Sequence, residues 1–241
     1  LEIYYLRNSD IPQYLEDGVI DIAIVGENLL IEKEKNVTVV ERLGFSKCRV
    51  SLAVPKGVEV KDIHYFEGKK IATSYPNTLK TYLDKNKVTA DLHVISGSVE
   101  IAPNIGLAQG IFDIVSSGST LFKNGLKETQ VVLKSEAVLA KSPTLTKDAQ
   151  QLLDQLLFRI QAVQRAKKSK YILLNVPNDK IEAVSSILPV LKSPTILPLA
   201  KEGWSSLHSV IEENQFWEVI DQLKLAGAED LLIVPIDKMV L

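Results

Sequence analysis

Cysteine, histidine and methionine are scarce in this chain of 241 residues. The single cysteine, Cys48, excludes an internal disulfide framework and a multi-cysteine metal site, and it is typical of a reducing cytosol. The three histidines, His64, His93 and His208, lie far apart in the sequence and do not indicate a histidine metal cluster.

Excess charge of one sign and long apolar runs are also absent. Because 28 basic residues face 30 acidic ones, no global positive field attracts nucleic acid or an anionic membrane, and any anionic ligand must be bound by local groups. No run of about 18 apolar residues spans a bilayer, and nothing resembles a signal peptide, so a cytoplasmic protein is predicted. A hydrophobic share of 46% excludes disorder and allows more than one core.

The first residues have the pattern of a strand already under way. Residues 1–6 read Leu-Glu-Ile-Tyr-Tyr-Leu, and the only methionine is Met239. We therefore expect this sequence to be an N-terminally truncated piece of a longer chain.

Strand and helix patterns alternate along the first two thirds of the chain. After the strand at 1–6, Pro12 favours the first turn of a helix that runs to Gly18, and the β-branched run at 19–25 predicts a strand buried on both faces of a parallel sheet. These three segments predict a βαβ unit, and similar alternation through residue 139 indicates an α/β fold.

The last third begins with an amphipathic helix and continues as a small module. Leucines, Ile160 and Val163 recur on one face of an expected helix over 146–168, which Thr146 can cap. Strands are then expected at 171–176, 194–199, 205–211 and 231–236, with helices at 180–187 and 215–226. This βαββαβ order predicts a ferredoxin-like module.

Residues 100–121 contain the most informative pattern, Glu-Ile-Ala-Pro-Asn-Ile-Gly-Leu-Ala-Gln-Gly-Ile-Phe-Asp-Ile-Val-Ser-Ser-Gly-Ser-Thr-Leu. A buried strand carries Asp113 and leads into a turn of hydroxyl residues around Gly118. Free N–H groups in such a turn can hold a phosphate, although Ser, Gly and Thr are also ordinary capping residues. Local physics leaves both interpretations open.

The complete stretch resembles the signature of the ATP phosphoribosyltransferase family, the first enzyme of histidine biosynthesis. The resemblance extends to Val19–Asn28, Leu43–Ala53, Ile71–Asn77 and the ending Gly-Ala-Glu-Asp-Leu-Leu-Ile-Val-Pro-Ile-Asp-Lys-Met, while Ser-Pro-Thr-Ile-Leu-Pro at 193–198 is similar to the regulatory domain of the long form. It implies a two-domain catalytic part of the type II periplasmic-binding-protein fold, followed by a ferredoxin-like regulatory domain. Residues 1–47 and 136–170 would form domain I, 48–135 domain II and 171–241 the regulatory domain.

The reaction implied is transfer of the phosphoribosyl group of phosphoribosyl pyrophosphate to N1 of ATP, with release of pyrophosphate. The sequence contains no nucleophile–base constellation, and in-line displacement needs none; Mg²⁺ and cationic groups would stabilise the leaving group. A first segment with the family's Lys-Gly-Arg-Leu motif is missing, so this truncated form is expected to be weakly active or inactive.

The resemblance also assigns substrate residues. The loop that grips the 5′-phosphate corresponds to Ser116, Ser117, Gly118, Ser119 and Thr120, and the acids near the ribose to Asp113 and Glu100. No metal ligand is assigned to a protein side chain. Where many relatives have an aspartate, this chain has Gln109, so no further carboxylate role is expected.

Three other residues are weaker candidates for substrate contact. Arg7 and Arg49 could meet phosphates or be ordinary surface arginines. Tyr75 could stack on adenine or simply pack in the core.

In the regulatory domain, the resemblance places Asn175, Leu191, Thr195 and Asp230 at contact positions for L-histidine, the family's feedback inhibitor. Asn175 replaces an acid found in some relatives, and this weakens the expected ion pair with the effector's amine. The alternative is a module used only for oligomer contacts. Dimers that assemble into hexamers are implied, without nucleic acid or membrane partners.

The sequence leaves two rival functions open. A non-catalytic small-anion-binding protein of the same fold would not need the signature at 100–121, and the transporter-type binding proteins carry export signals that are not seen here. An isolated regulatory partner without its own catalysis is the second rival.

Overall fold

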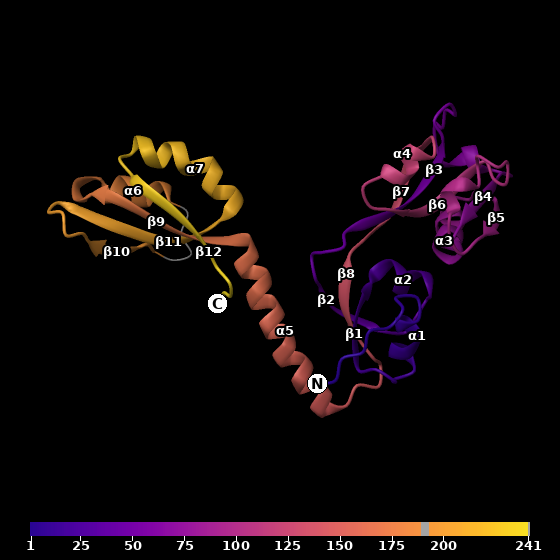
Figure 1. Ribbon diagram of the computed structural model, residues 1–241, viewed down its shortest axis with the longest axis horizontal. Helices are drawn as coiled ribbons and strands as arrows, with labels where there is room; N and C mark the ends of the chain where they lie inside the picture. Colours follow the sequence, from indigo (N-terminus) through magenta and orange to yellow (C-terminus); the bar gives the residue numbers. More distant parts are fainter. Residues whose placement is uncertain (189–192, 241) are drawn as a thin grey trace. The chain divides into compact units, whose positions relative to one another are not determined.

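The computed structural model describes residues 1–188 and 193–240, which form two compact units, Leu1–Gln150 and Gln151–Leu241 (Figure 1). Helix α5 (Lys147–Lys168) crosses the border between the units, and residues 151–170 are grouped with the C-terminal unit. The division into three domains stays a prediction. Among the described residues, no helix has the length and hydrophobicity that crossing a membrane requires.

The first lobe of the N-terminal unit is a small antiparallel sheet. Strand β8 (Ala137–Lys141) lies between β1 (Ile22–Gly26) and β2 (Thr38–Arg42), and helices α1 (Ile11–Glu16) and α2 (Glu27–Glu32) accompany them. The core of this lobe is apolar and contains Leu15, Ala23, Val25, Leu30, Val138 and Ala140.

Two expectations for this lobe are wrong. Residues 1–6 form no strand and are exposed, because a strand needs a hydrogen-bonded neighbour and the described residues offer this segment none. Strand β1 pairs antiparallel with β8, and its burial alternates, leaving the Ile24 side chain 55% exposed. The β-branched run therefore belongs to a strand with one buried face, and the expected βαβ unit is not formed.

The second lobe is a mixed five-stranded sheet. Its order is β5 (Asp91–Val94), β4 (Lys70–Thr73), β6 (Gly110–Val115), β3 (Cys48–Pro55) and β7 (Leu126–Ser135). Strand β4 is parallel to β5 and β6, whereas β3 is antiparallel to β6 and β7. Helices α3 (Pro76–Lys85) and α4 (Ser119–Lys123) and the short 3₁₀ turns Ile63–Phe66 and Val99–Ile101 complete the lobe. These elements confirm the expected α/β alternation.

Tight packing explains one glycine in this lobe. A Cβ atom added at Gly110 would lie 2.7 Å from the ring of Phe66, which is itself fully buried. Strand β6, which carries the candidate site, is therefore fixed against the core from its first residue.

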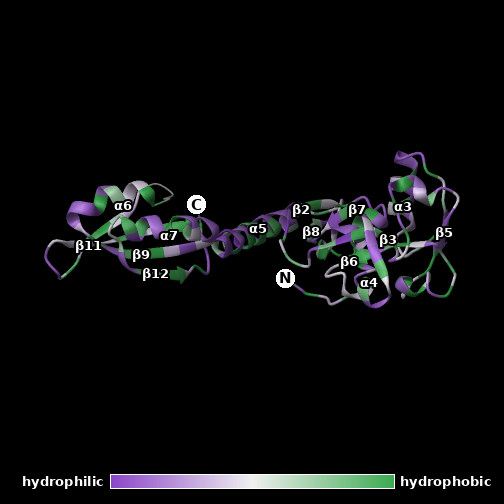
Figure 2. Ribbon diagram, turned by 90° about the horizontal axis from the view of Figure 1, so that it is seen from above, coloured by the Kyte–Doolittle hydropathy of each residue, from purple (hydrophilic) through white to green (hydrophobic). Residues whose placement is uncertain are grey.

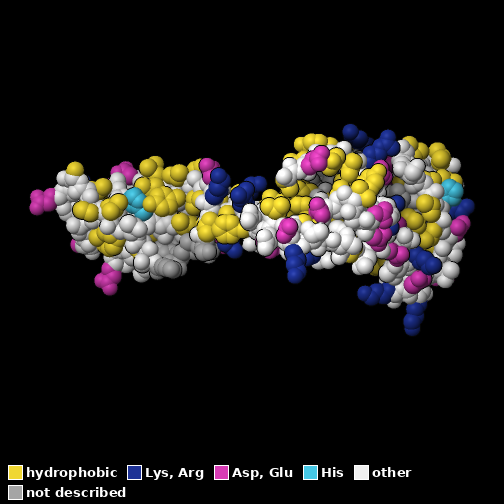
Figure 3. Space-filling view, turned by 90° about the horizontal axis from the view of Figure 1, so that it is seen from below, with side chains coloured by type: hydrophobic (Ala, Val, Ile, Leu, Met, Phe, Trp, Pro, Cys, Tyr) yellow, Lys and Arg dark blue, Asp and Glu magenta, His cyan; other side chains and the backbone are white. Residues whose placement is uncertain are grey.

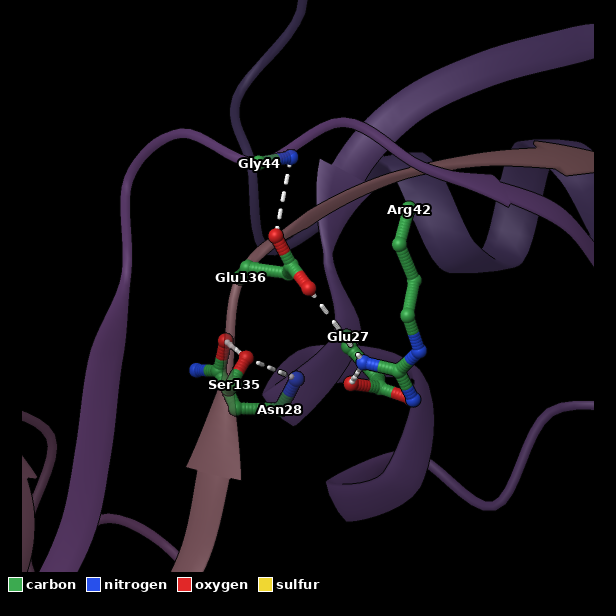
Figure 4. A network of polar contacts seen from close by, with 6 residues as sticks. All are labelled: Glu27, Asn28, Arg42, Gly44, Ser135 and Glu136. Atoms are coloured by element: carbon green, nitrogen blue, oxygen red, sulfur yellow. Dashed lines mark hydrogen bonds and ion pairs between the residues drawn. The ribbon is translucent and has the colours of Figure 1, made fainter. Parts of the chain in front are cut away.

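Two segments of chain connect the lobes, one between β2 and β3 and the other between β7 and β8 (Figure 1). Figure 4 shows a polar network at this crossing. The Glu136 carboxylate accepts a hydrogen bond of 2.8 Å from the Gly44 N–H and lies 3.7 Å from Arg42, which also pairs with Glu27. The two connections are therefore tied to each other and to the first turn of α2.

The C-terminal unit confirms the ferredoxin-like module. Its strands are β9 (Ser169–Pro177), β10 (Thr195–Pro198), β11 (Trp204–Glu212) and β12 (Glu229–Pro235), in the antiparallel order β10-β11-β9-β12. Helices α6 (Ile181–Ile187) and α7 (Glu213–Leu225) lie on one face of the sheet (Figure 1), over a core that includes Ile172, Leu174, Val184, Leu207, Phe216 and Leu223.

Helix α5 begins as predicted and is less buried than predicted. The Thr146 hydroxyl accepts a hydrogen bond of 3.2 Å from the Ala149 N–H, so Thr146 caps the helix. Of the expected apolar face, Leu153 is buried, whereas Leu152 is 58% exposed. Figure 2 shows hydrophilic and hydrophobic residues interspersed along the whole helix.

Candidate functional site

The candidate site is the turn between β6 and α4. Gly118 occupies the position before α4 with a φ of 79°, in the left-handed region that a side chain would strain. The Ser117 hydroxyl donates a hydrogen bond of 3.0 Å to the Ser119 hydroxyl. Helix α4 has only five residues, so its dipole contributes little, and the N–H and hydroxyl groups of the loop itself supply the donors.

A small cavity of about 100 Å³ opens at this turn. Ligand pockets for whole small molecules usually measure about 300–1,000 Å³, so this one has the size for a single anionic group rather than a nucleotide. The cavity is lined by the loop, the end of β6 and one acid from the neighbouring 3₁₀ turn: Glu100, Ile111, Asp113, Ile114, Val115, Ser116, Ser117, Gly118, Ser119, Thr120 and Leu121.

The two predicted acids meet at this cavity. Burial raises the pKa of the Asp113 carboxyl, and the charge of Glu100 adds to the rise, while hydrogen bonds from the Ile114 N–H and the Ser74 hydroxyl act against it. The Ser74 hydroxyl donates to Asp113 Oδ1 over 3.0 Å and so fixes the orientation of the carboxylate. An oriented carboxylate next to a donor-rich loop can accept from sugar hydroxyls while the loop holds a phosphate.

A divalent cation fits this donor set only together with a substrate. Mg²⁺ prefers oxygen ligands and is commonly bound by one or two carboxylates plus substrate phosphates. Asp113 and Glu100 are such a pair. Among the described residues, no three or more His, Cys, Asp or Glu side chains form a group that holds a metal ion.

Arg49 lies on β3, next to the loop but not in the lining of the cavity. Its guanidinium pairs with Glu128 on β7 and donates to the Ser116 carbonyl over 3.0 Å. The structure thus brings Arg49 to the first residue of the loop, outside the lining of the cavity.

The other two weaker candidates lie elsewhere. Arg7 is exposed in the segment before α1, and its carbonyl accepts hydrogen bonds from the N–H groups of Asp10 and Ile11. Tyr75 belongs to the core of the second lobe, and its hydroxyl accepts a hydrogen bond of 2.8 Å from the Asn28 amide. Burial raises the pKa of Tyr75 to about 12. Neither residue lines the cavity.

Three supporting residues carry no signal in the sequence. Ser74 holds Asp113, Glu128 accepts from the Arg49 guanidinium, and Ser51 donates to Glu128. Their importance depends on which strands pair across 39 to 79 residues of sequence, and no local spacing reveals that.

The effector residues are partly brought together. The Asn175 amide on β9 donates a hydrogen bond of 3.1 Å to the Asp230 carboxylate on β12, at a bulge where Asp230 has a φ of 49°. Thr195 lies on β10, two strands away from Asn175. Leu191 falls outside the described residues.

Comparisons with known proteins cover nearly the whole chain. A family model described as "ATP phosphoribosyltransferase" matches residues 7–162, and one described as "HisG, C-terminal domain" matches residues 166–238. The ATP phosphoribosyltransferase of Cytophaga hutchinsonii is 57% identical over 240 residues, which cover 100% of this chain and 84% of that protein. That of Phocaeicola vulgatus is 53% identical over 241 residues, with 100% and 85% covered.

A solved structure agrees with these matches. The ATP phosphoribosyl transferase (HisG:HisZ) complex from Thermotoga maritima is similar with a TM-score of 0.59 and 29% sequence identity, over 66% of this chain and 77% of that chain.

Proposed function

The chain belongs to the ATP phosphoribosyltransferase family, and from this premise we propose that the loop Ser116–Thr120, with Asp113 and Glu100, binds its substrate phosphoribosyl pyrophosphate. The enzyme transfers the phosphoribosyl group of that substrate to N1 of ATP and releases pyrophosphate, in the first step of histidine biosynthesis. The rival function of a non-catalytic anion-binding protein is thereby set aside.

The observation that supports the site most strongly is the meeting of both acids with the hydroxyl loop at one small cavity. A 5′-phosphate in the loop would accept from the N–H groups of residues 117–120 and from the serine and threonine hydroxyls. Asp113 and Glu100 would then accept from the ribose hydroxyls, with Ser74 holding Asp113 in place.

The reaction requires that the protein holds two polyanionic substrates, phosphoribosyl pyrophosphate and ATP, in line. Positive charge develops at the anomeric carbon as the bond to pyrophosphate breaks and the bond to adenine N1 forms. With the 5′-phosphate in the loop, the carboxylates of Asp113 and Glu100 would lie beside the ribose and would stabilise this charge. The loop would hold the phosphate end of the substrate. The displacement then requires that the two substrates are oriented in line, and it needs no protein nucleophile.

Mg²⁺ is the cation that we expect with these substrates. It neutralises the charge of the leaving pyrophosphate when bound. Asp113 and Glu100 are the carboxylates that could share it with phosphate oxygens.

Calorimetric titration with phosphoribosyl pyrophosphate in Mg²⁺ tests this assignment. Asp113→Asn keeps the size and the bond from Ser74 but lowers the acceptor strength, and Thr120→Val removes one hydroxyl from the loop. We expect each variant to bind at least about tenfold more weakly, since a charge-assisted hydrogen bond contributes about 1.5–3 kcal/mol. Unchanged affinity in both variants refutes the site. The exposed Ser9→Ala substitution is the control and should bind as the unaltered protein does.

The C-terminal unit is the regulatory module of this proposal. Asn175 and Asp230 present an amide and a carboxylate that can bind the amine of L-histidine. Calorimetry that detects no heat with excess L-histidine would refute this role. The cytoplasmic location also stays a prediction.

Self-association through the C-terminal unit is part of the same proposal. The sheet face opposite α6 and α7 carries exposed apolar side chains, with Leu197 47%, Leu232 60% and Val234 43% exposed. Figure 3 shows hydrophobic side chains gathered on the surface of this unit around a histidine. Contiguous apolar surface of this kind favours contact with another copy of the chain, in dimers and hexamers.

A further inference from the structure

The guanidinium of Arg49 donates three hydrogen bonds, two to Glu128 and one to the backbone of Ser116. Its Nε and Nη2 each donate a hydrogen bond of 2.6 Å to one oxygen of the Glu128 carboxylate, which is the bidentate geometry of the strongest ion pairs. Its Nη1 donates over 3.0 Å to the carbonyl of Ser116, the first residue of the candidate loop. Two of the five N–H groups of the guanidinium are left over.

Glu128 is fixed from a second direction. The Ser51 hydroxyl donates a hydrogen bond of 2.7 Å to Glu128 Oε1. Strand β3 carries both Arg49 and Ser51 and lies between β6 and β7, so it connects Glu128 on β7 with the loop that follows β6. The side chains of Arg49 and Glu128 are 31% and 24% exposed, which limits screening by solvent.

The pair keeps its charges over the ordinary pH range. The bonds from Arg49, and more weakly the bond from Ser51, lower the pKa of Glu128 against the effect of burial. Glu128 in turn raises the pKa of Arg49. The contact to the Ser116 carbonyl is therefore made by a cation that Glu128 both neutralises and orients.

A carbonyl held in this way fixes the peptide unit that follows it. The C=O of Ser116 and the N–H of Ser117 belong to one planar trans peptide and point in opposite directions. While the carbonyl is held by Arg49, the Ser117 N–H points away from the guanidinium. Gly118 follows immediately, and a Cβ atom there would lie 3.9 Å from Arg49 Nη2.

We propose that Glu128 is a positioning residue of the phosphoribosyl pyrophosphate site, which acts through Arg49 on the Ser116 carbonyl to hold the phosphate loop in its binding conformation. The inference rests on the proposed assignment of the loop. It gives Arg49 a different main role from the direct phosphate contact that the sequence suggests.

The two roles of Arg49 predict opposite results for Glu128→Gln. If Arg49 is mainly a phosphate ligand, removal of the competing carboxylate frees its charge and phosphoribosyl pyrophosphate binds more tightly. If Arg49 and Glu128 position the loop, the amide cannot hold the fork at both oxygens, and the same substrate binds more weakly. Arg49→Lys separates the roles again, because lysine keeps the charge but loses the fork.

Calorimetric titrations with phosphoribosyl pyrophosphate in Mg²⁺, and separately with ATP, test the proposal. We expect Glu128→Gln and Arg49→Lys each to weaken phosphoribosyl pyrophosphate binding about tenfold and to leave ATP binding unchanged, whereas a general loss of structure would lower both. The double variant should be no weaker than either single variant, since the residues act as one unit. Glu213→Gln, which breaks the 3.3 Å ion pair with Lys170 in the other unit, is the matched control and should bind normally.

The outcomes separate the two levels of the proposal. Unchanged or tighter substrate binding by Glu128→Gln overturns the inference, and so does full retention of affinity by Arg49→Lys. If Asp113→Asn and Thr120→Val weaken binding while these variants do not, the loop assignment stands and only the positioning role falls. If Asp113→Asn and Thr120→Val also bind normally, the proposed site itself is refuted.

Discussion

At the scale of single residues, the chain binds anions without an excess of positive charge. Donors are concentrated in one loop, and a nearby arginine is neutralised by Glu128 rather than left free. The sequence predicts the residues that line the cavity, because they form one continuous segment with an interpretable pattern. It does not predict Glu128 or Ser74, because their contacts depend on pairing between distant strands.

Tyr75 provides a test of residue burial through alkaline stability. Its pKa is 10.0 in the unfolded chain and about 12 in the fold, chiefly because of burial. Burial disfavours the charged form of the Tyr75 side chain. The contribution of neutral Tyr75 to the free energy of unfolding is therefore complete below pH 10 and is lost as the pH rises through about 12. Compared with Tyr75→Phe, the unaltered protein should lose about 2–3 kcal/mol more of its free energy of unfolding across that interval.

Urea unfolding at several pH values between these limits measures the difference. The Tyr5→Phe variant is the control, since the Tyr5 side chain is 97% exposed. Parallel loss of stability in the unaltered protein and Tyr75→Phe would show that burial of Tyr75 is not linked to its protonation.

At the scale of elements, a side chain from helix α2 of the first lobe caps the N-terminus of helix α3 of the second lobe. Tyr75, the residue before α3, makes no side-chain cap, and the buried Glu32 carboxylate takes its place. It accepts from the N–H groups of Asn77 and Thr78 over 3.0 and 2.9 Å and from the Thr78 hydroxyl over 2.7 Å. The turn that carries Ser74 is therefore fixed by the other lobe.

Glu32→Gln should destabilise the protein by about 2 kcal/mol. Its amide group would turn an NH₂ toward donors that are already buried, and an unsatisfied buried donor costs about 1–3 kcal/mol. Chemical unfolding measures the effect, with the exposed Glu34→Gln as the comparison variant. An equal and small change in both variants would contradict the capping role of Glu32.

Elements defined by local pattern were predictable, and those defined by their neighbours were not. The ferredoxin-like order, the α5 cap and strand β6 follow from periodicity and turn residues. The direction of β1 and the absence of a strand at 1–6 depend on which strand lies beside each segment. Periodicity indicates that one face of a helix or strand is buried, but it does not identify the element that lies beside it.

At the scale of the whole molecule, the family models and the packing of the structure both divide the chain in two, but at different residues. The two family models divide the chain between residues 162 and 166, inside α5, while the compact units divide at Gln150. Sequence resemblance therefore locates the functional modules, and packing decides how the connecting helix is shared. The function proposed for the whole molecule requires that the loop Ser116–Thr120 holds the phosphate of phosphoribosyl pyrophosphate.

Backbone amide NMR during titration with phosphoribosyl pyrophosphate and Mg²⁺ tests that claim most directly. We expect the saturable shifts to be largest at the amides of Ser117, Gly118, Ser119 and Thr120. Asp113→Asn and Glu128→Gln should move the half-saturation of these shifts to higher ligand concentration. Saturable binding that leaves these loop amides unshifted would contradict this expectation.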